Sequence, residues 1–368
     1  MAKTIIQGRL THKLRSLAVS CAAGGTVLLR RLAGRPLVAA WPPVMEYATL
    51  FWHWQFNHAL RLARESPAEC RAYFDSLYAV TEDYPDVSHR PSAAHEPRGD
   101  WYIPQHGRST ITLLHFHGGG YAFHAAVSRH FAASLAHYLG VSVFAPDYRL
   151  TPEHPHPAQR DDALAAYRHL LASGVPASQI VLCGDSAGGH LALMTLAELA
   201  DAGLPQPLLT LALSPWTDTG ERGASLYGND RFDLVQGYMT QRFAQWLKGG
   251  QPLSDAELSP ITRDYRGQGP IYLQVGGREI LVDMIRDFAR SQAANGAQLR
   301  LDVWPEMNHE FHAFGRTHPD SHAALLRLRE ALDWAESQRP FPPQPYTEID
   351  TLAANLTRVA ISAIPITP

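Results

Sequence analysis

A serine flanked by glycines is the side chain of this sequence best placed to act as a nucleophile. Ser186 stands in the run Gly184-Asp-Ser-Ala-Gly188, after an apolar segment and before leucines at helical spacing. A sharp turn from strand to helix exposes such a serine at the carboxyl edge of a sheet, and the glycines give the turn room. The start of the helix also favours negative charge nearby. We predict that Ser186 is an acyl-transfer nucleophile; the alternative is a serine that merely caps a helix in a glycine-rich turn.

A second glycine-rich run, His117-Gly-Gly-Gly120, follows another apolar segment. Consecutive glycines let the backbone approach a ligand and direct N–H groups toward it, which an oxyanion hole requires. We expect the N–H groups of Gly118, Gly119 and Ala187 to form that hole. A phosphate-gripping loop is the alternative, but the lysine and the serine or threonine of that motif are missing here.

A serine hydroxyl is a poor nucleophile at neutral pH, so it needs a histidine base within hydrogen-bond reach. In folds built around this kind of serine turn, the base follows the acid in the chain. His309 lies in a loop after an apolar run that ends at Trp304, whereas His318 and His322 adjoin or enter a helical pattern. We favour His309, and His312 remains the competitor on the sequence alone.

The histidine in turn needs a carboxylate that orients it. Glu279, Asp283 and Asp287 all follow the apolar run at 271–275. A carboxylate near the start of a helix is also an ordinary surface feature, and that must be true of at least two of the three. Spacing alone does not choose among them.

Short apolar runs alternate with helical patterns from about residue 110 onward, which is typical of a mostly parallel sheet covered on both faces. We interpret residues 96–338 as a catalytic domain. Residues 1–95 form an N-terminal cap segment, residues 216–266 a cap insertion, and residues 339–368 a proline-rich linker and tail. The tail docks either on its own domain or on another subunit. The predicted strands are 111–116, 141–145, 180–183, 208–213, 271–275 and 299–304.

The overall composition argues against several classes of function. With 18% charged residues and a net charge of −3, the chain has no basic excess that would indicate a nucleic-acid partner. The three cysteines have no metal-ligand spacing and favour a reducing, cytoplasmic compartment. His115 and His117 are two positions apart, so on a strand both would face the same side, as two ligands of one metal ion do. No convincing third ligand accompanies them. We expect no metal and no cofactor.

The N-terminal apolar stretch at 17–29 superficially resembles a signal peptide. Gly24 and Gly25 interrupt it, Arg30 and Arg31 follow it at once, and it is too short to span a bilayer. We interpret it as an amphipathic cap helix. Peripheral contact with a membrane and assembly into a homo-oligomer are the partner hypotheses that stay open.

Six motifs follow one another along the chain: HGGGY at 117–121, DYRLTPEHPHPA from 147, GDSAGGH at 184–190, LSPWTD from 213, VGGREILVD ending at 283 and WPEMNHEF around 309. Together they resemble the hormone-sensitive lipase family of α/β-hydrolases, the acetyl-hydrolase and arylacetamide-deacetylase-like group. The resemblance covers residues 85–335 and implies the α/β-hydrolase fold with a helical cap. It implies that Asp283 is the catalytic acid and His309 the base, and that the block from Asp147 braces the active-site floor through Arg149, Glu153 and His154. His124 departs from the family, which more often has a small residue there.

These residues predict a serine carboxylesterase that hydrolyses short- to medium-chain esters through Ser186, His309 and Asp283. We also expect Tyr121 and Trp216 to line the substrate pocket. An amidase or lactonase with the same triad is the alternative within enzymes. A hydrolase-fold protein that binds a small molecule without turnover is the alternative from another class.

Overall fold

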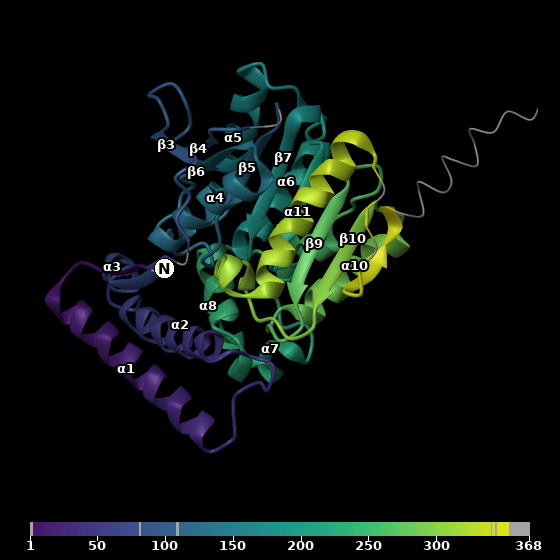
Figure 1. Ribbon diagram of the computed structural model, residues 1–368. Helices are drawn as coiled ribbons and strands as arrows, with labels where there is room; N and C mark the ends of the chain where they lie inside the picture. The colour runs from purple at the N-terminus through teal and green to yellow at the C-terminus, as the bar shows by residue number, and fades with distance from the viewer. Residues whose placement is uncertain (1–2, 81, 108–109, 340, 343, 353–368) are drawn as a thin grey trace, which may run out of the picture.

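One sheet of nine strands forms the centre of the computed structural model, which describes residues 3–80, 82–107, 110–339, 341–342 and 344–352 (Figure 1). The strand order is β11-β10-β9-β8-β7-β5-β6-β4-β3. The pairs from β6 through β10 are parallel, whereas β3, β4 and β11 pair antiparallel at the two edges. The strands are β3 (Val87–Pro91), β4 (Gly99–Pro104), β5 (Thr112–Phe116), β6 (Ser142–Pro146), β7 (Ile180–Asp185), β8 (Leu209–Leu213), β9 (Ile271–Gly276), β10 (Leu299–Trp304) and β11 (Thr347–Asp350).

The six strands predicted from the sequence correspond to β5 through β10, with ends that differ by at most two residues. Their side chains are buried on both faces of the sheet, apart from the partly buried first residue of β6. Strands covered on both faces are apolar almost throughout, which is why these runs stand out in the sequence. The predicted α/β-hydrolase fold class is confirmed.

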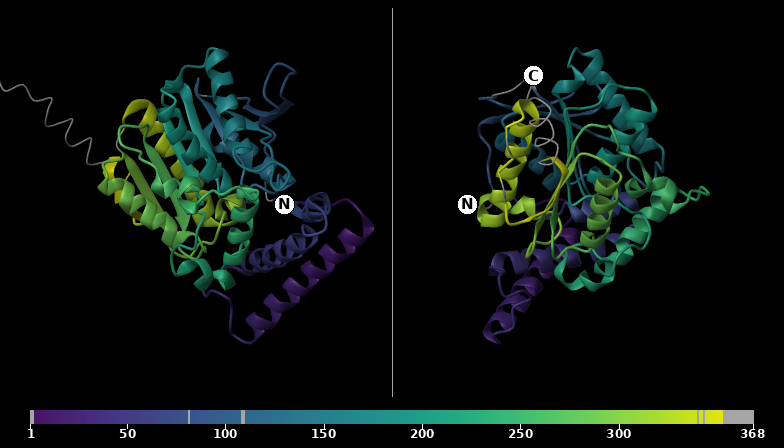
Figure 2. Two further views of the ribbon diagram at one scale, coloured as in Figure 1. Left: turned by 180° about the vertical axis from the view of Figure 1, so that it is seen from behind. Right: turned by 90° about the vertical axis from the view of Figure 1, so that its right-hand side faces the viewer.

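Helices cover the two faces of the sheet and bury a separate core on each (Figure 2). On one face, Leu164 of α5, Leu191 of α6 and Phe288 of α10 pack with sheet residues. On the other, Leu135 of α4 and Leu328 of α11 do the same. The covering helices are α4 (Ala126–Leu139), α5 (Ala158–Ala172), α6 (Ala187–Asp201), α10 (Val282–Ala294) and α11 (Pro319–Ser337).

The N-terminal segment adds three helices and a small ribbon at one end of the molecule (Figure 1). α1 (Leu10–Leu32) lies along α2 (Pro43–Leu62), and α3 (Pro67–Phe74) follows. Before α1, β1 (Lys3–Ile6) pairs antiparallel with β2 (Leu77–Val80). The predicted amphipathic helix at 17–29 is therefore part of α1, which buries Val19, Ala23 and Val27 against α2.

The predicted insertion at 216–266 holds only short helical pieces and α8. The long helix of this insertion is α8 (Gly237–Lys248), which ends at Gly249 in a left-handed conformation. The short pieces are α7 (Ser225–Gly228), η2 (Asp230–Phe232), α9 (Asp255–Leu258) and η3 (Pro260–Thr262); elsewhere η1 (Ala177–Gln179) precedes β7 and η4 (Phe311–Thr317) precedes α11.

Part of the C-terminal segment belongs to the sheet itself. β11 pairs with β10 as an edge strand, so residues 347–350 dock on their own domain. The rest of the predicted tail, residues 353–368, lies outside the described residues.

Candidate active site

Ser186 occupies the turn between β7 and α6 with φ of 54° and ψ of −118°. This conformation is rare for residues other than glycine and is typical of a strained nucleophile turn. A Cβ atom at Gly184 would overlap the backbone of Gly188, and one at Gly188 would overlap the carbonyl of Phe116. Both flanking glycines are thus required by close backbone approach, and the predicted geometry of the Ser186 turn is present.

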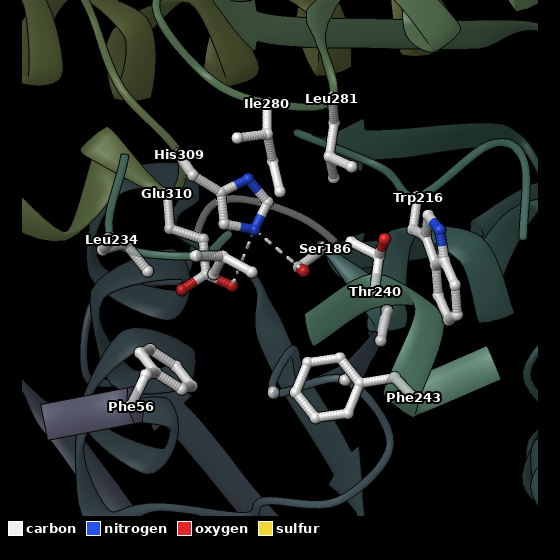
Figure 3. A pocket seen from close by; sticks show the side chains of 14 residues that line it. Phe56, Ser186, Trp216, Leu234, Thr240, Phe243, Ile280, Leu281, His309 and Glu310 are labelled. Carbon is white, nitrogen blue, oxygen red and sulfur yellow. Dashed lines mark hydrogen bonds and ion pairs between the residues drawn. The ribbon is translucent and has the colours of Figure 1, made fainter. Parts of the chain in front are cut away.

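His309 contacts the serine from the loop after β10. Its Nε2 lies 2.9 Å from Ser186 Oγ, which is hydrogen-bond distance (Figure 3). The competitor His312 points elsewhere: its Nε2 lies 2.8 Å from Gln274 Oε1, and burial lowers its pKa to about 3. The structure therefore resolves the choice between the two histidines in favour of His309.

The carboxylate that contacts His309 is Glu279. Its Oε2 lies 2.7 Å from His309 Nδ1, and its side chain is fully buried. The other oxygen, Oε1, accepts hydrogen bonds from Ser214 Oγ at 3.0 Å and from the N–H of Gly276 at the end of β9. These bonds fix the carboxylate from behind while it faces the imidazole.

The expectation that Asp283 contacts His309 is wrong. Asp283 lies in the first turn of α10, where its Oδ2 accepts the backbone N–H of Ser225 at 2.9 Å. Asp287 lies one turn further along and pairs with Arg222 and Arg290 at 3.7 and 3.6 Å. Glu279 precedes the helix, in the turn after β9, and of the three candidate acids it is the one that contacts the imidazole of His309.

A further carboxylate, Asp233, connects the acid loop and the base loop. Oδ2 accepts the N–H of Ile280 at 2.7 Å, and Oδ1 accepts the N–H of His309 at 3.2 Å. Asp233 is fully buried, and burial raises its pKa to about 7. Sequence reasoning missed this residue, because it lies in the insertion, far along the chain from both loops it joins.

The backbone donors next to Ser186 differ in part from the prediction. The N–H of Gly118 donates to Asp185 Oδ2 at 2.8 Å, so it is already used. Gly119, Gly120 and Ala187 line the cavity beside Ser186. Among the described residues, no acceptor is recorded for the N–H groups of these three. The assignment of Gly118 as a free donor is therefore wrong, whereas Gly119 and Ala187 do line the cavity, together with Gly120.

Glu310 follows His309 directly and adds an acidic group to the cavity. Its backbone is left-handed, with φ of 53°, and its Oε1 lies 3.9 Å from His309 Nε2. About a third of the side chain, 32%, stays accessible. Burial of the carboxyl, together with the neighbouring Asp185 carboxylate, raises the pKa of Glu310 to about 8.

The cavity at Ser186 has mostly apolar walls and about 480 Å³ of empty space, part of which is open to solvent. Figure 3 shows Phe56 and Phe243 on one side and His309 and Ile280 on the other. Trp216 lines the cavity as expected, together with Leu234, Val235, Thr240 and Leu281.

Tyr121 does not line this cavity, so that expectation is wrong. Its side chain is buried and its hydroxyl lies 2.6 Å from Nδ1 of His190, within α6. The residue packs behind the Ser186 turn instead of facing the cavity.

Three comparisons with known proteins show which proteins this chain is similar to. An α/β-hydrolase fold family model matches residues 113–313. An acetyl-hydrolase of Streptomyces hygroscopicus is 34% identical, with 77% of this chain and 92% of the relative covered. A solved structure of an esterase from the bacterial hormone-sensitive lipase family has a TM-score of 0.71 and 30% identity, covering 80% of this chain and 98% of that one.

The chain belongs to the hormone-sensitive lipase family of α/β-hydrolases. It is a carboxylic ester hydrolase. A second relative, an esterase of Acinetobacter venetianus, is 27% identical over 78% of this chain and 97% of its own length.

Arg149 and Glu153, two of the floor residues implied by the family resemblance, form ion pairs with other protein groups. Arg149 pairs with Asp162 at 2.8 Å, and Glu153 pairs with Arg71 of α3 at 2.8 Å. Glu153 therefore ties the hydrolase domain to the N-terminal segment. His124, the departure from the family, stacks on His117 with ring centres 4.0 Å apart and bonds Asp147.

His115 and His117, the two histidines considered as metal ligands, each have a ring nitrogen within hydrogen-bond distance of another protein group. Nε2 of His115 lies 2.9 Å from Asp185 Oδ1, and Nδ1 of His117 lies 2.8 Å from the carbonyl of Gly118. His115 thus supports Asp185, the residue before Ser186, and His117 supports the glycine-rich run that begins at Gly118.

Proposed function

We propose that Ser186, His309 and Glu279 act as the catalytic triad of a carboxylesterase. The observation that carries this proposal is the unbroken contact from Ser186 Oγ through the imidazole to Glu279, at 2.9 and 2.7 Å. The acid is then a glutamate, in place of the aspartate expected from the sequence. Glutamate serves this role in other α/β-hydrolases as well.

In the first step, His309 Nε2 takes the proton of Ser186 as Oγ attacks the ester carbonyl. The imidazolium that forms keeps its Nδ1–H directed at the buried carboxylate of Glu279, which stabilises the positive charge. The N–H groups of Gly119, Gly120 and Ala187 receive the developing oxyanion. Loss of one such donor typically costs about 3 to 4 kcal/mol of transition-state stabilisation.

His309 then gives its proton to the leaving alcohol, and the acyl group stays on Ser186. In the second step water enters, His309 removes its proton, and the same donors hold the second oxyanion. The bond between Ser186 Oγ and the acyl group then breaks, Ser186 regains its hydroxyl, and the carboxylic acid is released. In the first half of the cycle His309 thus moves a proton from Ser186 to the alcohol, and in the second half it moves one from water to Ser186.

For the substrate, we propose esters with short to medium acyl chains. A narrow cavity with walls of Phe56, Phe243 and Trp216 suits a small apolar group. The names of two relatives support small acyl groups: the acetyl-hydrolase, and an ethyl acetate hydrolase of Pseudomonas putida that is 30% identical over 60% of this chain.

The test is hydrolysis of p-nitrophenyl esters with acyl chains from two to sixteen carbons, with Ser186→Ala as control. We expect the highest kcat/KM at eight carbons or fewer, and a loss of about four to six orders of magnitude in the variant. A maximum at long, insoluble chains would overturn the substrate proposal alone. Ordinary activity of the variant would overturn the nucleophile.

We also propose that the enzyme works in a reducing compartment such as the cytoplasm. Cys21, Cys70 and Cys183 are all free, and burial raises the pKa of the Cys70 thiol to about 12. Titration with a thiol reagent, after purification without reductant, should find three thiols in the denatured chain. Fewer than three would count against this compartment.

A further inference from the structure

The outer face of α1 carries a stripe of exposed leucines. Leu10, Leu14 and Leu17 lie on this face, and Leu28 and Leu32 continue it after Cys21 and Gly25. The leucines are 38% to 76% exposed. The opposite face of α1, with Val19, Ala23 and Val27, is buried against α2. α1 is therefore apolar on two faces, and α2 covers only one of them.

The stripe is unusual for this molecule. Of the eleven large hydrophobic side chains that are exposed in the described part of the chain, eight lie between residues 6 and 44. Single exposed leucines need no explanation, but a contiguous apolar patch marks an interaction site. The eight are Ile6, Leu10, Leu14, Leu17, Leu28, Leu29, Leu32 and Val44.

The charged side chains of α1 itself are all basic, and two acidic residues outside α1 face its ends. Glu69 of α3 pairs with Arg9 and with His12 at the start of α1. The first acidic residue of the chain is Glu46, so α1 carries only basic charges. Glu46 pairs with Arg30 and Arg31 at 3.6 and 2.9 Å. Lys13 and Arg15 also belong to α1, and no ion pair of theirs is recorded within the described residues. Two α1 helices packed face to face would bring these like charges together, whereas an anionic surface would neutralise them.

We propose that α1 binds flat on the surface of an anionic phospholipid bilayer. The leucine stripe enters the boundary between headgroups and acyl chains, and the basic side chains contact the lipid phosphates. A helix of 23 residues presents a line about 34 Å long to such a surface. None of the described helices is long and apolar enough to cross a membrane, so the contact is interfacial.

The position of α1 connects this surface to the cavity. α1 packs on α2, and Phe56 of α2 lines the cavity together with Phe243 of α8. Figure 1 places α1, α2 and α8 at the same end of the molecule. A bilayer held against α1 thus lies at the end of the molecule that carries Ser186. This membrane contact does not rest on the proposed triad, since it depends only on the outer face of α1.

The first experiment is sedimentation with vesicles of phosphatidylcholine alone or mixed with phosphatidylglycerol. We expect the full chain to bind mixed vesicles at least tenfold more tightly than neutral ones. Leu14→Ser with Leu28→Ser should weaken that binding at least tenfold. Tyr227→Ser with Leu326→Ser removes exposed apolar side chains elsewhere and serves as the matched control, which should bind like the parent.

Folding of these variants is checked by circular dichroism and by hydrolysis of a water-soluble ester, neither of which should change. Equal binding of the parent and the Leu14/Leu28 variant would overturn the proposal. So would equal binding to neutral and anionic vesicles.

A label at Cys21 distinguishes a bilayer from a second copy of the chain. Cys21 lies in the stripe and is exposed, whereas Cys70 and Cys183 are buried. A polarity-sensitive fluorophore on Cys21 should shift to the blue when anionic vesicles are added and stay unchanged as protein concentration rises. A shift with concentration alone would instead assign the stripe to self-association and overturn the lipid proposal.

Discussion

Oε2 of Glu279 lies 2.7 Å from Nδ1 of His309, with both side chains buried. The carboxylate is fixed by Ser214 and the backbone of Gly276, so the imidazole meets an acceptor that is already in place. Asp283, only four residues further along, bonds the backbone of Ser225. This difference determines which acid can assist Ser186.

The pH dependence of the rate should reflect the contact between His309 and Glu279. Burial lowers the pKa of His309, but the hydrogen bond and charge of Glu279 more than offset this and raise it above its usual value near 6.5. The base is active only when neutral, so activity should rise with pH through a midpoint above 6.5. The check is kcat/KM measured from pH 5 to 10. A midpoint at or below 6.5 would count against the ion pair.

Asp233 should act as a positioning residue for the loops of Glu279 and His309. Asp233→Asn replaces one acceptor oxygen by an NH2 group that faces backbone N–H groups, and a buried donor left unpaired costs about 1 to 3 kcal/mol. We expect kcat to fall about tenfold to a hundredfold with KM little changed, because the reacting groups lose alignment. Steady-state kinetics and urea unfolding measure the two effects separately. A stability loss with wild-type kcat would leave Asp233 a purely structural residue.

Phe243 should limit the acyl length that the cavity accepts. Its ring lines the cavity on α8 and is buried. Phe243→Leu removes ring volume, and one or two methylenes in an apolar pocket change kcat/KM by about tenfold or more. The ratio of kcat/KM for the octanoyl ester to that for the butyryl ester should therefore rise at least about threefold. The matched control is Phe288→Leu. Phe288 is a core residue of α10 that does not line the cavity, so this variant should leave the octanoyl-to-butyryl ratio unchanged.

The parts of the site that follow from local sequence were predictable. Ser186 is flanked by glycines between an apolar strand and a helix, and each of these features is visible in the residues. His309 was favoured because it lies in a loop just after the last parallel strand. The central strands were predictable because both faces of the sheet are covered, which makes them apolar throughout.

The acid was not predictable, because Glu279, Asp283 and Asp287 recur at intervals of four residues and share one helical period. What separates them is where α10 begins: it starts at Val282, which leaves Glu279 in the turn and Asp283 on the helix. Gly118 was misassigned for a similar reason. Its N–H is used by Asp185, a contact between residues 67 positions apart that no local pattern reveals.

The most direct test of the triad compares Glu279→Gln with Asp283→Asn. Both substitutions replace a carboxylate by an amide of the same size, so the two variants control for each other. We predict that Glu279→Gln lowers kcat by about 10³- to 10⁴-fold, because the imidazolium loses its buried counter-charge. Asp283→Asn should stay within about threefold of the parent, since its carboxylate only accepts a backbone N–H. The reverse pattern, with Asp283→Asn inactive and Glu279→Gln active, would contradict this account.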